Sequence, residues 1–115
     1  MNQDDVLKEL STTADCLQVV EPNAIEALQN RNSYIARVNY LGKWIDHWYA
    51  NKSAELFEAD PKMPSWKWEI LIMQYPEGRM QRLRRQIIKT IELQCSNLRA
   101  ELIETASERK FTGAL

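Results

Sequence analysis

Glycine and proline are scarce in this sequence, which has three glycines and four prolines among 115 residues. Hydrophobic residues make up 44% of the chain and charged residues 27%. This composition excludes collagen-like and intrinsically disordered chains, and it is typical of an ordered globular protein. The length indicates one domain, residues 1–115, and the shortage of helix breakers predicts an all-α fold.

Residues that supply catalytic or metal chemistry are equally few. The two cysteines, Cys16 and Cys95, lie far apart within helical patterns, which predicts reduced core thiols rather than a disulfide. The single histidine, His47, has no Cys, Asp or Glu at ligand spacing, so we interpret it as a surface residue. The sequence contains no phosphate-cradling glycine loop, nucleophile elbow or zinc spacing. We therefore expect no metal, no cofactor and no enzymatic activity.

Long apolar runs are also missing. No stretch of the sequence approaches the roughly 18–20 apolar residues that a membrane helix needs. The first ten residues, MNQDDVLKEL, are acidic where a signal peptide would be basic. These two features predict a cytoplasmic protein without membrane contact.

Helix caps and prolines divide the chain into segments. Asn2 is a suitable N-cap with acidic residues following it, and Asn23 has the same role before Glu26, at capping-box spacing. Pro22 separates the two helices that these caps begin. We expect a short N-terminal helix, a long helix, a connector and a C-terminal helix: residues 1–20, 23–57, 58–78 and 79–107. In the connector Ser65 is a candidate N-cap for a short helix. The alternation of Trp66, Trp68, Ile70 and Ile72 also fits a short strand, and we favour helix or irregular structure.

Apolar residues recur at helical spacing in both long segments. We expect these segments to pair as a long antiparallel helical hairpin, with the short N-terminal helix beside it. Their apolar faces are wider than a coiled-coil seam, and the short helix alone cannot cover them. The pattern therefore predicts a homo-oligomer.

A cluster of positive charge opens the C-terminal segment. The stretch GRMQRLRRQIIK contains no acidic residue, and Arg82, Arg85 and Lys89 fall on one helical stripe away from the apolar face, flanked by Arg79. The stripe is either a phosphate-binding surface or a solvated or subunit-pairing face. Arg84 lies on the apolar side, where a charge must be paired, so we expect an ion pair with Glu26, Asp46 or Glu55.

The connector combines aromatic and basic residues in the stretch KMPSWKW. Single-stranded nucleic acid is held by aromatic rings that stack on bases and by cations that meet phosphates. Lys62, Trp66, Lys67 and Trp68 provide both kinds of group, although only one tryptophan of a helical turn can be free to stack. The alternative is that the tryptophans close the open end of the hairpin.

In order and kind of element, roughly residues 3–105 resemble the phage recombination-mediator family, the UvsY-like proteins. The nearest local likeness is YLGKWIDHWYANKSAE, an aromatic–Lys–Trp–apolar core that leads into a Lys/Ser stretch. The resemblance implies a ring-like oligomer in a bacterial or phage-infected host cell. It also implies partners, namely single-stranded DNA, a recombinase and the single-strand-binding protein that covers the DNA. This chain departs from the family in being slightly acidic, with a formal net charge of -1.

Two functions follow from these patterns. The first is a non-enzymatic accessory protein of DNA transactions that binds single-stranded DNA through the basic and aromatic residues above. The second is a helical protein-interaction module, such as an adaptor, a phage-encoded inhibitor or a structural subunit, without affinity for nucleic acid.

Overall fold

The computed structural model describes the backbone of residues 2–113 and the side chains of residues 2–108. In this part of the chain all regular structure is helical, in five helices: α1 (Gln3–Cys16), α2 (Ala24–Leu41), α3 (Lys43–Ala59), α4 (Ser65–Met73) and α5 (Pro76–Gly113). The all-α prediction is therefore confirmed. The molecule is elongated, with extents of 69 × 33 × 18 Å.

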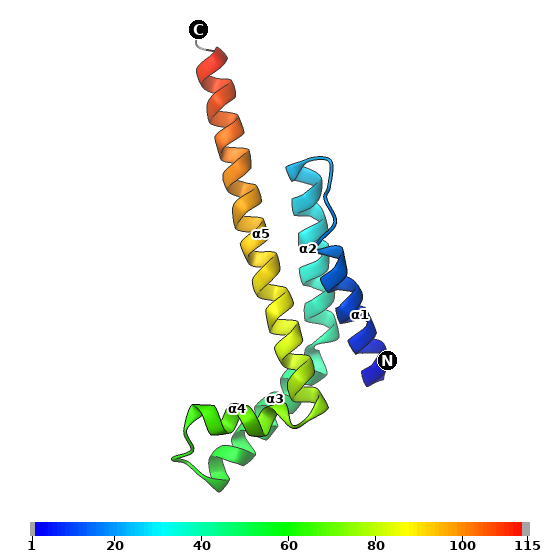
Figure 1. The fold of residues 1–115 in the computed structure, drawn as a ribbon, viewed down its shortest axis with the longest axis vertical. Helices are drawn as coiled ribbons and strands as arrows, with labels where there is room; N and C mark the ends of the chain where they lie inside the picture. Colours follow the sequence, from blue (N-terminus) through cyan, green and yellow to red (C-terminus); the bar gives the residue numbers. More distant parts are fainter. Residues whose placement is uncertain (1, 114–115) are drawn as a thin grey trace.

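Helix α5 is the long rod on which the other helices pack (Figure 1). Helix α2 lies antiparallel along it. Helix α1 begins at the N-terminus, near the lower end of the rod, and runs upward beside α2. Helices α3 and α4 form a short hairpin that projects to one side and returns the chain to the start of α5. The predicted antiparallel hairpin is thus formed by α2 and α5, with α1 beside it.

The hydrophobic core lies where α1, α2 and α5 meet. Its fully buried side chains come from all three helices and from the start of α3, and the largest are Leu10, Ile45, Ile91, Val6 and Val38. Cys95 belongs to this core as predicted, whereas Cys16 is only half-buried and lies outside it; both are free thiols in the structure.

The two predicted asparagine caps are present. The Oδ1 atom of Asn2 accepts a hydrogen bond from the Asp5 N–H at 2.9 Å, and Asn23 accepts one from the Glu26 N–H at 2.8 Å. The predicted cap at Ser65 is wrong. Pro64, in an extended conformation, occupies the N-cap position of α4 without a side-chain hydrogen bond, so Ser65 is the first helical residue.

Several helix boundaries differ from the prediction. Helix α1 ends at Cys16 and not near residue 20, and α3 extends to Ala59. Residues 23–57 form two helices that meet at Gly42, rather than one. Helix α5 begins at Pro76, because proline is well suited to a first helical position whose N–H would have no partner. It then continues to Gly113 instead of ending near residue 107.

Arg84 of α5 packs against the junction of α2 and α3, and it is only 7% exposed. Its guanidinium donates to the backbone C=O of Val38 at 3.2 Å and to Asp46 Oδ1 at 2.7 Å. This confirms that Arg84 is paired and identifies Asp46 as the partner among the three predicted. The side chain passes so close to Gly42 that a Cβ there would lie 1.8 Å from the Arg84 Nε.

We therefore expect Gly42→Ala to lower the free energy of unfolding by about 1–3 kcal/mol, the usual cost of overpacking a filled site. This loss would occur although alanine has the higher helix propensity. The measurement is urea unfolding followed by circular dichroism. In an Arg84→Ala background the same substitution should be neutral or stabilising, because the obstructing side chain is gone. Equal losses in both backgrounds would contradict the proposed cause.

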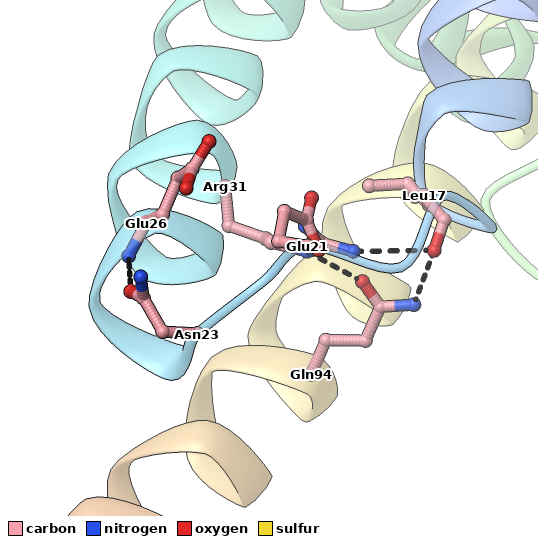
Figure 2. Close-up of polar contacts among 6 residues, drawn as sticks. All are labelled: Leu17, Glu21, Asn23, Glu26, Arg31 and Gln94. Atoms are coloured by element: carbon pink, nitrogen blue, oxygen red, sulfur yellow. Dashed lines mark hydrogen bonds and ion pairs between the residues drawn. The ribbon is translucent and has the colours of Figure 1, made fainter.

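The loop between α1 and α2 is fixed to α5 by a second buried arginine, Arg31 (Figure 2). Its Nε donates to Gln94 Oε1 at 2.9 Å, and its guanidinium also pairs with Glu21. Gln94 in turn donates to the C=O of Leu17 at 3.1 Å, which Arg31 also contacts. Burial raises the pKa of Glu21, but the hydrogen bond and charge of Arg31 outweigh this effect and hold the pKa below its usual value.

Candidate nucleic-acid interface

A groove of about 440 Å³ lies where the α3–α4 hairpin meets the first half of α5. We call it the α3–α4–α5 groove. Its lining includes aromatic, basic and polar side chains: Tyr49 from α3, Trp68, Glu69, Ile72 and Met73 from α4, and Gly78, Gln81, Arg82, Arg85, Gln86 and Lys89 from α5.

The close approach of α4 and α5 forms one end of this groove. Gly78, in the first turn of α5, is buried against the last turn of α4. A Cβ at this position would lie 2.0 Å from the backbone oxygen of Ile72, so only glycine permits the two helices to lie this close. Arg79, the next residue, donates to the C=O groups of Met73 and Gln74 at 3.0 and 3.2 Å. It therefore caps the C-terminus of α4, where a positive charge also favours the helix dipole.

Two aromatic rings meet within the groove. Tyr49 and Trp68 pack edge to face, with ring centroids 5.4 Å apart and an interplanar angle of 89°. The guanidinium of Arg85 lies 4.6 Å from the centroid of the Tyr49 ring, at cation–π distance. An aromatic surface and a cation thus lie in direct contact here.

The three cations of the predicted stripe, Arg82, Arg85 and Lys89, all line this groove from α5. We call these three residues the basic stripe. All are exposed, and within residues 2–108 none of them forms an ion pair with a carboxylate. Glu69 is the one acidic residue in the lining, so the groove has an excess of positive charge although the chain as a whole is slightly acidic.

The other predicted site residues lie outside the groove lining. Trp66 is 64% exposed on α4, and Lys67 follows it on the same helix. Lys62 lies in the turn before α4, where its backbone N–H donates to Asp60 Oδ1 at 3.2 Å. The structure therefore brings Trp68 together with the basic stripe, and it leaves Lys62, Trp66, Lys67 and Arg79 around this group rather than in it.

The two tryptophans of the connector have different environments, as helical geometry requires. Trp68 is half-buried against Tyr49, whereas Trp66 is 64% exposed. The alternative in which both tryptophans close the end of the hairpin therefore does not hold for Trp66. His47 is exposed on α3, in agreement with its interpretation as a surface residue.

Tyr49 is the aromatic residue of the groove that the sequence pattern did not single out as a binding residue. Its helical spacing assigned it to the apolar face of the long segment, and it is indeed half-buried. The missing information was the turn at residues 60–64, which brings Trp68 of α4 back onto the Tyr49 ring.

Neither a metal site nor a membrane span stands out in the described structure. The described side chains include no group of three or more His, Cys, Asp or Glu residues that could hold a metal ion. Among residues 2–113, no helix has the length and apolar character that crossing a bilayer requires.

Comparisons with protein-family models, with curated proteins and with solved structures gave no match to this chain.

Proposed function

We propose that this protein is a non-enzymatic accessory protein of DNA transactions that binds single-stranded DNA in the α3–α4–α5 groove. The observation that supports this proposal is one open groove that the basic stripe and an aromatic pair line together, with Arg85 in contact with the Tyr49 ring. Proteins that bind single strands without reading sequence combine such a positively charged groove with rings on which bases stack.

In this proposal the basic residues of the groove contact phosphates and its tryptophan contacts a base. Arg82 and Lys89 are seven helical steps apart, about 10 Å along α5, and with Arg85 between them they meet the phosphates of the strand. Trp68 offers the part of its ring that Tyr49 leaves uncovered as a stacking surface for a base. Trp66, Lys62 and Lys67 extend the contact beyond the groove, along the strand that leaves it.

The resemblance to phage recombination mediators supports a more specific role. Proteins of that kind help to load a recombinase onto DNA that is covered by single-strand-binding protein. We propose the same role here, with the recombinase and the single-strand-binding protein as partners and with several copies of this chain acting together. Copies that lie next to one another on the same strand would add up their weak sites.

Fluorescence anisotropy of a labelled oligo-dT, titrated with the full chain at low and near-physiological salt, tests DNA binding directly. We expect binding at low salt that weakens by a factor of ten or more at the higher salt, because each neutralised phosphate releases counterions. No binding at low salt would contradict the proposal and would favour a helical protein-interaction module.

A further inference from the structure

Within the residues that the structure describes, helix α5 has a second face that no other helix covers. Leu93, Ser96, Ala100 and Ile103 follow one another at steps of three and four residues, on the side opposite the core residues Ile91 and Cys95. We call these four residues the outer face. Leu93 is 63% exposed and Ile103 is 68% exposed, which is high for large apolar side chains in the middle of a helix. In Figure 1 the last part of α5 rises beyond the end of α2, with no neighbouring helix beside it.

The outer face continues the line of the basic stripe along α5, since Lys89 is followed four residues later by Leu93. The two halves of the helix carry opposite charge. Residues 79–91 contain basic residues and no acidic one, whereas residues 92–108 contain four glutamates and one arginine. Glu101 and Glu104, beside the outer face, are exposed, and neither forms an ion pair within the part of the chain whose side chains are described.

From this pattern we propose that the outer face of α5 docks a second copy of this chain, whose own α5 lies antiparallel to it. An antiparallel register in which Leu93 of one copy packs against Ser96 of the other places Arg85 opposite Glu104. The same register places Lys89 beside Glu101 of the second copy. Two-fold symmetry repeats each pair, so that two acidic halves meet two basic halves.

A parallel arrangement in register is excluded by the same charges, because it would place one basic stripe directly against the other. In this register the small side chain of Ser96 lets the two helices approach closely around Leu93, which supplies the apolar contact at the centre. Ile103 lies between Arg85 and Lys89 of the second copy and packs on their aliphatic stems. Pairing covers Arg85 and Lys89, so single-stranded DNA would compete with the second copy for these two cations. The two copies would pair in the absence of DNA, so the pairing can be tested even if the protein binds no DNA.

Charge reversal tests the arrangement without DNA. Sedimentation velocity should show the parent associating as a dimer or a larger assembly at tens of micromolar. Arg85→Glu/Lys89→Glu and Glu101→Lys/Glu104→Lys should each weaken association at least about tenfold, because every attractive pair becomes repulsive. A one-to-one mixture of the two variants should associate again, since each reversed stripe then meets a reversed acidic half.

The control is Lys8→Glu/Lys43→Glu, which reverses two exposed charges outside α5 and should leave association unchanged. Circular dichroism melting of each variant shows that the fold is intact. A parent that stays monomeric would overturn the proposal. So would association that survives both reversals, or a mixture of the two variants that fails to associate.

Discussion

Replacing Arg31 with methionine is expected to lower the free energy of unfolding by about 3–5 kcal/mol, the usual cost of breaking a buried ion pair by removing one partner. The side chains of Arg31 and Glu21 are only 5% and 8% exposed. Methionine would fill much of the space, but it would leave the Glu21 carboxylate and the amide of Gln94 without their donor. The loop that joins α1 to α2 would lose every bond that Arg31 makes and would keep only the hydrogen bond from Gln94 to the C=O of Leu17 as its polar link to α5.

Two further variants separate the unpaired charge from the loss of packing. Adding Glu21→Gln to Arg31→Met should recover a large part of the stability, because no uncompensated buried charge then remains. Arg37→Met, which breaks a pair with Glu9 whose side chains are 47% and 35% exposed, should cost less than about 1 kcal/mol. Urea unfolding followed by circular dichroism measures all three variants. A loss at Arg31 no larger than the loss at Arg37 would show that the buried network is not needed for stability.

Replacing the whole basic stripe with alanine is expected to reduce the affinity for oligo-dT by about 10–100-fold at low salt, since three phosphate contacts are removed. The triple variant Arg82→Ala/Arg85→Ala/Lys89→Ala should keep its stability within about 1 kcal/mol of the parent, because all three side chains are exposed. Anisotropy titrations measure the affinity, and thermal melting measures the stability.

A matched control removes the same amount of positive charge elsewhere. Lys8, Lys43 and Arg99 are exposed and do not line the groove. Their combined replacement by alanine should change the affinity by less than about threefold, an effect of net charge alone. An equal loss of affinity for oligo-dT in the two triple variants would mean that DNA is attracted by the net charge of the chain and not bound in the groove.

Local chemistry made several features predictable from the sequence. Asparagine followed by acidic residues identified the starts of α1 and α2, because a side-chain acceptor satisfies backbone donors within the same turn. Arg84 was identified as a paired residue because its spacing put a charge on the apolar side of α5, and Asp46 is its partner.

The remaining features depend on contacts between distant segments. The division at Gly42 could not be read from the long apolar pattern, and the contact that requires glycine there is made by Arg84, a residue 42 positions later in the chain. The grouping of Trp68 with the basic stripe, and the exclusion of Lys62, Trp66 and Lys67, depend on how α4 folds back between α3 and α5. Periodicity places residues on one side of a helix, but it does not say which helix lies opposite.

The most direct test of the groove as a DNA site is the salt dependence of oligo-dT binding, measured for the parent and the stripe variant in parallel. For single strands the logarithm of the affinity falls with the logarithm of salt concentration by about 0.7 for each phosphate contact. If Arg82, Arg85 and Lys89 each meet a phosphate, the slope of the variant should be smaller by about 2. Equal slopes would contradict the account, since they would mean that the stripe does not touch the DNA.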